Sequence, residues 1–143
     1  MTDPALVLAK LTTLEDHVQR VERRLAEAGD VQRFRLDLDR QDALALSLIV
    51  ALQEAADIAL HIASDAGWGV ASSYSQSFEV LSSHGVIDTD LCARMIGIAT
   101  LRNRIAHGYG SVDFERIWHE APHGMTALRA FAAAIAAYLT SAD

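Results

Sequence analysis

The sequence predicts an all-helical, up-and-down bundle of about five helices that forms a single domain over residues 1–143. Hydrophobic residues make up 51% of the chain, against only eight glycines and two prolines. This Ala- and Leu-rich composition favours helices. Apolar positions recur at steps of three and four residues, as on one face of a helix. No stretch of useful length alternates in the manner of a half-buried strand.

The first predicted helix runs from Val7 to Ala28, and its apolar side chains form one narrow stripe. The stripe favours packing against neighbours in the same chain, and pairing with a second copy is the alternative. Gly29 supplies the end of this helix. The next pattern, from about Arg40 to Ala66, is apolar on nearly every side, which indicates a helix buried by neighbours all round.

Capping residues mark the next two helices. Ser73 and Gln76 have the spacing of a capping box at the start of a short helix. Asp88 then caps a long helix, and Asp90 in its first turn complements the helix dipole. The apolar face of this helix leads directly toward Arg102.

The C-terminal part is expected to form two more helices. Asp113 caps the first of them. Pro122-His123-Gly124 is expected to interrupt the helical pattern with a kink or a turn, because proline cannot donate a backbone hydrogen bond. The last helix then covers about residues 125–139.

Bulk properties limit the function classes. The chain carries a formal charge of -7 and one cysteine, Cys92, which excludes an internal disulfide and is typical of a reducing compartment. The N-terminus lacks the basic segment of a secretory signal, and the most apolar run, Ala43 to Leu52, is shorter than the ~20 residues that span a bilayer. We therefore expect a soluble cytoplasmic protein with no membrane partner. The acidic balance argues against a general nucleic-acid coat and still permits a small basic site.

A local basic segment stands out in this acidic chain. Residues 91–112 contain no acidic side chain, whereas they do contain Arg94, Arg102, Arg104 and His107. Arginine binds phosphate strongly, and histidine exchanges protons near neutral pH. The segment is therefore the candidate site for phosphate chemistry.

Arg102 and His107 do not converge on a straight helix. They are five positions apart in the sequence, so they lie roughly 140° apart around the axis and about 7.5 Å along it. Asn103, in contrast, shares a face with His107. Convergence requires either that the helix unwinds at His107-Gly108 or that two copies of the chain pair, so that each Arg102 faces the other chain's histidine.

The same residues also suit a purely structural role. Arginine and histidine in the last turn of a helix oppose the helix dipole and cap free carbonyls, which is worth about 0.3–1 kcal/mol. By itself, Arg-x-x-x-x-His therefore favours a helix cap over a catalytic site.

We expect no metal and no cofactor. Zinc–thiolate sites require several cysteines, and ferritin-like bundles require Glu-x-x-His on several helices. Glu120 and His123 have that spacing, but Pro122 lies between them. Asp57 and His61 share a helix face, where a hydrogen-bonded pair at the edge of the core is favoured over a metal or catalytic pair.

The segment Arg102–Tyr109 matches R-x-x-x-x-H-x-Y, the signature of HepT-like toxins in the HEPN superfamily, and the resemblance extends over about residues 36–120. The further landmarks that resemble this family are Gln41-Asp42-Ala43, Gly67-Trp68-Gly69-Val70 with Ser73-Tyr74 and Phe78, Gly85-Val86-Ile87-Asp88, and Ser111-Val112-Asp113 with Arg116-Ile117-Trp118.

The resemblance implies a metal-independent ribonuclease toxin of a type VII toxin–antitoxin system, acting on RNA such as tRNA or mRNA. HepT-like proteins are helical homodimers whose arginine and histidine meet in a cleft at the dimer interface. Their partner is a minimal nucleotidyltransferase antitoxin that adenylylates the motif tyrosine. Carried over to this sequence, Arg102 and His107 are catalytic, Asn103 supports them, and Tyr109 is the modified residue.

The residue types fit that chemistry, because RNA carries its own nucleophile, the 2′-hydroxyl. A histidine moves the proton, and an always-charged arginine holds the phosphate and stabilises the developing charge. Two alternatives from other classes remain. One is a non-catalytic helical binding or scaffold subunit of a nucleotidyltransferase, and the other is a dimeric structural protein in which Arg102 and His107 only cap a helix.

Overall fold

The computed structural model describes residues 2–108 and 112–141. This part of the chain forms six helices, and it contains no strand. In chain order they are α1 (Pro4–Ala28), α2 (Val31–Leu36), α3 (Leu38–Asp65), α4 (Tyr74–Ser83), α5 (Thr89–His107) and α6 (Phe114–Ser141). The predicted all-α class is confirmed.

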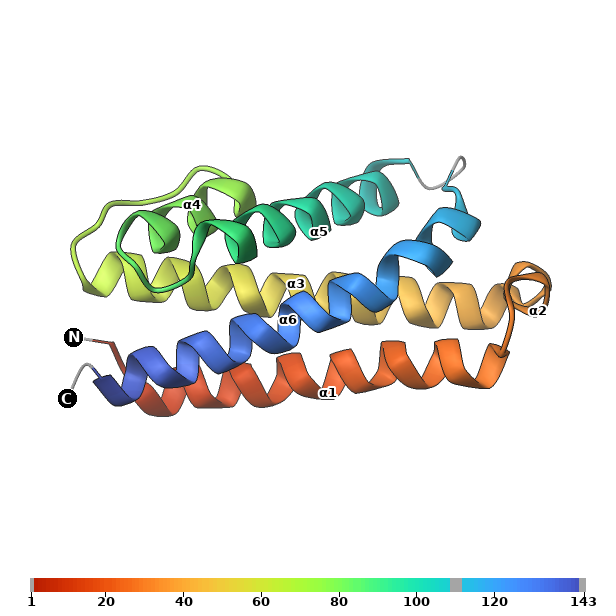
Figure 1. Ribbon diagram of the computed structural model, residues 1–143, viewed down its shortest axis with the longest axis horizontal. Coiled ribbons are helices and arrows are strands. Elements are labelled where there is room, and N and C mark those ends of the chain that lie inside the picture. Colours follow the sequence, from red (N-terminus) through yellow and green to blue (C-terminus); the bar gives the residue numbers. More distant parts are fainter. Residues whose placement is uncertain (1, 109–111, 142–143) are drawn as a thin grey trace.

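The four long helices run alternately up and down (Figure 1). α1 and α6 lie side by side with α3, and α5 packs on α3 and α6 from the other side. The short α2 lies at the end of the bundle where α5 finishes, and α4 lies at the opposite end, near both termini of the chain (Figure 1). This topology brings the C-terminal end of α5 and the first turn of α6 to the same end of the molecule.

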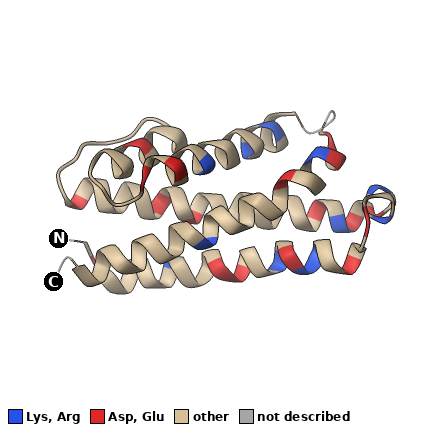
Figure 2. Ribbon diagram, viewed as in Figure 1, with Lys and Arg blue, Asp and Glu red and all other residues tan. Residues whose placement is uncertain are grey.

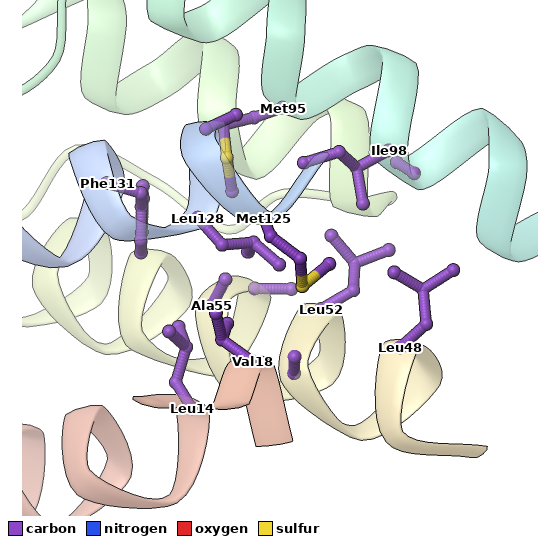
Figure 3. Close-up of a cluster of buried hydrophobic side chains, with 14 of the residues drawn as sticks. Leu14, Val18, Leu48, Leu52, Ala55, Met95, Ile98, Met125, Leu128 and Phe131 are labelled. Carbon is purple, nitrogen blue, oxygen red and sulfur yellow. The ribbon is translucent and has the colours of Figure 1, made fainter. Parts of the chain in front are cut away.

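The core forms around α3, as its all-round apolar pattern predicts. Leu48, Leu52 and Ala55 of α3 are fully buried, and α1, α4, α5 and α6 all contact this helix. Figure 3 shows side chains from α1, α5 and α6 meeting those of α3 in one layer. Those labelled there are Leu14, Val18, Leu48, Leu52, Ala55, Met95, Ile98, Met125, Leu128 and Phe131.

The stripe on α1 faces inward. Its members Val7, Leu14, Val18 and Val21 are fully buried, and α1 packs on α3 and α6. Of the two alternatives for this stripe, packing within the chain is therefore correct. Gly29 ends the helix with a φ of 81°, a left-handed conformation that glycine adopts without strain.

The predicted caps are also confirmed. The side chain of Asp88 accepts a hydrogen bond from Leu91 N–H at 2.7 Å, and that of Asp113 accepts from the second and third N–H groups of α6. Ser73 Oγ accepts from Gln76 N–H at 3.1 Å. Each cap satisfies donors that a helix start leaves free.

The short helix α2 was not predicted. Phe34 is its one buried residue, and one buried side chain in a charged segment gives no periodicity to detect. Buried Gln41 of α3 fixes α2 in place, because its Nε2 donates to Phe34 O at 2.7 Å and to Arg35 O at 3.0 Å. The amide thereby satisfies the carbonyl of Arg35 at the end of α2 and gives the carbonyl of Phe34 a second donor besides the N–H of Asp37.

Of the kink or turn expected at Pro122-His123-Gly124, the turn is wrong, because α6 runs through this segment as one helix. Proline removes one backbone donor, and its ring lies exposed. The same face of α6 is buried on both sides of Pro122, at Ile117 and Ala121 before it and at Met125 after it. Burial of this continuous face outweighs one lost hydrogen bond.

α3 is long and apolar enough to cross a membrane by length and composition, with a mean hydropathy of 1.8 over its most apolar window. The apolar stretch is thus longer than the run over residues 43–52 suggested. Within the fold, 56% of that window is buried. Packing in the core accounts for this hydropathy.

We predict that Pro122→Ala stabilises the protein. Alanine restores the missing donor in the middle of α6, so the free energy of unfolding should rise by about 1–3 kcal/mol. Urea denaturation followed by circular dichroism measures the change. Pro4→Ala is the matched control, since Pro4 lies in the first turn of α1, where proline costs little. An equal effect of both substitutions would contradict this account of α6.

Candidate functional site

The candidate site lies at the C-terminal end of α5. The buried residues Met95, Ile98, Leu101 and Ile105 hold this helix against the core. α5 remains helical through His107, and the N–H of Gly108 still donates to Arg104 O at 2.9 Å. The helix therefore does not unwind at His107, so the first of the two ways to bring the arginine and the histidine together does not occur in this structure.

Arg102 is half-buried and points into the space between α5 and α4. Its Cζ lies 5.1 Å from the centroid of the Tyr74 ring, a cation–π distance. Its Nη1 donates to Asn103 Oδ1 at 3.2 Å. Its Nε is buried and finds no hydrogen-bond partner among the described residues. A buried charged donor without a partner raises the free energy of the folded protein, and a hydrogen bond to an incoming acceptor would remove this cost.

His107 and Asn103 are exposed. Because α5 is a regular helix here, His107 lies about 140° around the axis from Arg102. The structure thus brings Arg102 and Asn103 into contact and directs His107 to another side of the helix. Tyr109, the fourth predicted residue, lies outside the described residues.

An apolar patch adjoins these residues. A hollow of about 360 Å³ opens between α3, the end of α5 and the segment that leads into α6. Leu46 of α3 stands in it with 62% of its surface exposed, and Ala106 of α5 is exposed as well. We call this the α3–α5 patch. Its apolar members are Ala45, Leu46, Ile49, Ile105, Ala106, Val112 and Phe114, and the acidic Asp42 also lines it.

Figure 2 shows basic residues along α5 toward its C-terminal end and acidic residues near its start. The predicted basic segment therefore belongs to α5. Cys92, on the buried face of the same helix, is not a candidate nucleophile. Burial raises the pKa of its thiol, more than the hydrogen bond with Ser82 lowers it, and only the thiolate is reactive.

The other candidates from the sequence do not form a site. Asp57 makes no hydrogen bond with His61, so the predicted pair is wrong; Asp57 Oδ2 instead lies 3.6 Å from Lys10 Nζ of α1. No local pattern could predict this contact, because Lys10 is distant from Asp57 in the chain. Among the described residues, no three His, Cys, Asp or Glu side chains gather as metal ligands would.

Tyr74 lies beside the candidate site, although no pattern in the sequence predicts its contact with Arg102. It starts α4, and it meets Arg102 only because α4 folds back along α5. Its place in the segment Ser73-Tyr74 resembled a family landmark, but spacing alone could not show which side chain it touches.

A protein-family model described as ribonuclease HepT-like matches residues 14–135. The chain belongs to this family. The matched region includes α3, α4 and α5 entirely, and with them all residues of the candidate site that the structure describes.

Individual proteins similar to this chain have descriptions that agree with the family model. The mRNA nuclease HepT of Shewanella oneidensis is 25% identical over 118 residues, which cover 82% of this chain and 86% of that protein. The solved structure of a tri-AMPylated Shewanella oneidensis HEPN toxin in complex with an MNT antitoxin matches with a TM-score of 0.84 and 26% identity, over 96% of this chain and 99% of that one. A substituted form of the toxin–antitoxin pair MntA–HpeT matches with a TM-score of 0.82 and 25% identity, over 93% and 98%. The HEPN-like fold is thereby confirmed.

Proposed function

We propose that this protein is the toxin of a type VII toxin–antitoxin pair and acts as a metal-independent endoribonuclease in the bacterial cytoplasm. Arg102, Asn103 and His107 carry the reaction. The observation that supports this most is the state of Arg102, whose half-buried guanidinium keeps an unpartnered Nε and rests on Tyr74. A residue that only capped the helix end would direct its donors to the free carbonyls of α5.

Arg102 binds the scissile phosphate in this proposal. The Tyr74 ring supports the guanidinium from one side, and Asn103 orients it through Nη1. A prepositioned, always-charged group stabilises the charge that develops on the phosphate without having to reorganise.

His107 moves the proton. Its neutral imidazole takes the proton of the ribose 2′-hydroxyl while the 2′-oxygen attacks phosphorus. The bond from phosphorus to the 5′-oxygen breaks, and the imidazolium returns the proton to that oxygen. The products are a 2′,3′-cyclic phosphate and a 5′-hydroxyl. No metal is required for this step, because RNA supplies the nucleophile.

The active unit is a homodimer. Arg102 and His107 diverge on one helix, so each needs the other residue from a second copy. The α3–α5 patch beside them supports such pairing, since exposed apolar surface next to a half-built site is typical of an interface.

The antitoxin is a minimal nucleotidyltransferase, and Tyr109 is its target. The tri-AMPylated state of the Shewanella oneidensis toxin in its complex with an MNT antitoxin supports this assignment. Nucleotides on Tyr109, two residues after His107, would add negative charge and bulk where RNA must enter.

The first test is cleavage of tRNA and a structured mRNA in EDTA. Wild-type protein should leave cyclic-phosphate ends, and His107→Ala should lower the rate about 10²- to 10⁴-fold. Mass spectrometry of the wild type verifies that Tyr109 carries no AMP. Unmodified wild type that cuts neither RNA would favour the scaffold subunit instead.

A mixed dimer tests the shared site. Arg102→Ala and His107→Ala proteins should each be inactive alone. Unfolded and refolded together, they should regain about a quarter of wild-type activity, because half of the dimers are mixed and each mixed dimer has one intact site. Mixed dimers that form and remain inactive would show that the arginine and histidine act within one chain.

Substitution of Tyr74 tests the support of Arg102. Tyr74→Ala should lower the cleavage rate about tenfold through loss of the cation–π contact. Tyr74→Phe keeps the ring and should retain the wild-type rate, which separates support of Arg102 from chemistry of the hydroxyl. Thermal unfolding of both variants serves as the control for folding, and equal rates for the two would count against this role.

A further inference from the structure

A second hollow lies between α5 and α6, on the other side of α5 from the α4 contact. Its volume is about 390 Å³. The floor is apolar and comes from three helices, with Leu48 of α3, Ile98 and Leu101 of α5, and Ala121 and Ala127 of α6. We call it the α5–α6 groove.

The rim of the groove is basic. Arg94 and Arg104 line it from α5, and Arg116 and His123 line it from α6, against one acidic residue, Glu120. This excess of positive charge contrasts with the formal charge of -7 on the whole chain. A basic rim above an apolar floor suits a ligand that carries phosphates and flat, weakly polar rings.

The arginines differ in how strongly they are engaged. Arg116 Nε donates to Glu120 at 2.7 Å, while Arg94 lies 3.8 Å from Asp90, a distance beyond a hydrogen bond. Arg104 forms no ion pair or side-chain hydrogen bond with the described residues, and it is exposed. At least one guanidinium on the rim is thus available to a ligand.

The groove leads to the candidate site. Arg94 and Arg104 are ten residues apart on α5, about 15 Å along the axis, and Arg104 precedes His107 by less than one turn. A bound strand could therefore contact both arginines and still reach His107.

We propose that the α5–α6 groove binds a single-stranded segment of the RNA substrate that flanks the cleaved bond. This inference rests on the proposed ribonuclease function. The rim arginines contact the phosphates, and Arg104 can also stack on a base through its planar guanidinium. The floor takes up apolar base surface, so binding depends on charge and stacking and little on sequence.

Gly97 offers a way to close the groove without damaging the fold. It lies in the middle of α5 and lines the groove, and a Cβ at this position would meet no atom within 4 Å. Glycine is unfavourable inside a helix, so Gly97→Leu should leave α5 at least as stable while its side chain occupies the groove.

The test measures, by fluorescence anisotropy at several salt concentrations, how tightly the full-length His107→Ala protein binds RNA. The probe is a fluorescent, unstructured RNA of about 12 nucleotides, a length chosen to exceed that of the groove. Adding Arg94→Gln should weaken binding about fivefold and reduce the slope of log K against log salt by about 0.7, the loss of one phosphate contact on a single strand. Gly97→Leu should weaken binding by a similar factor with the slope unchanged.

Arg23→Gln is the matched control. Arg23 is an exposed arginine on α1 with a similar loose partner, Glu27 at 3.7 Å four residues away, and its substitution should leave RNA binding unchanged. Wild-type cleavage combined with unaltered binding by both groove variants would overturn the groove assignment and leave the ribonuclease function intact. Failure of the His107→Ala protein to bind RNA, together with an inactive wild type, would overturn both. Groove variants that instead disrupt the homodimer or the antitoxin complex would assign this surface to a protein partner.

Discussion

The packing of the other helices around α3 is the constraint on which the structure depends. Among the described helices, α3 contacts all the others, namely α1, α2, α4, α5 and α6, and none of the others meets so many partners. Leu48 serves both the core and the floor of the α5–α6 groove. Because interiors are tightly packed, a change in α3 would shift α5 and α6 together. The end of α5 is therefore held by the core, while its polar side chains remain at the surface.

In this arrangement, the buried face of α5 provides rigid support, and the polar candidate residues lie on its other faces. The candidate residues near the C-terminal end of α5 point in three directions: Arg102 toward α4, His107 toward solvent and Arg104 toward α6. A single helix cannot bring such groups to one point, because its geometry fixes their angles. In the proposed dimer, a second copy would complete the site from outside.

Under the proposed ribonuclease function, the acidic character of the chain would limit where RNA binds. Surface charge away from the end of α5 repels a polyanion, so binding would be confined to the small basic area around the motif. The same area would be sensitive to added negative charge. Modification of Tyr109 would then oppose RNA through electrostatics as well as through bulk.

The sequence by itself determined the all-α class, most helix boundaries and the position of the motif. Helix caps and periodic apolar faces act over a few residues, so Ser73, Asp88 and Asp113 could be read locally. Only the tertiary structure decided the rest. Pro122 stays inside a helix because distant core contacts outweigh its local cost, and Arg102 meets Tyr74 because α4 folds back along α5. Contacts between residues far apart in the chain depend on how whole helices pack, which no local pattern encodes.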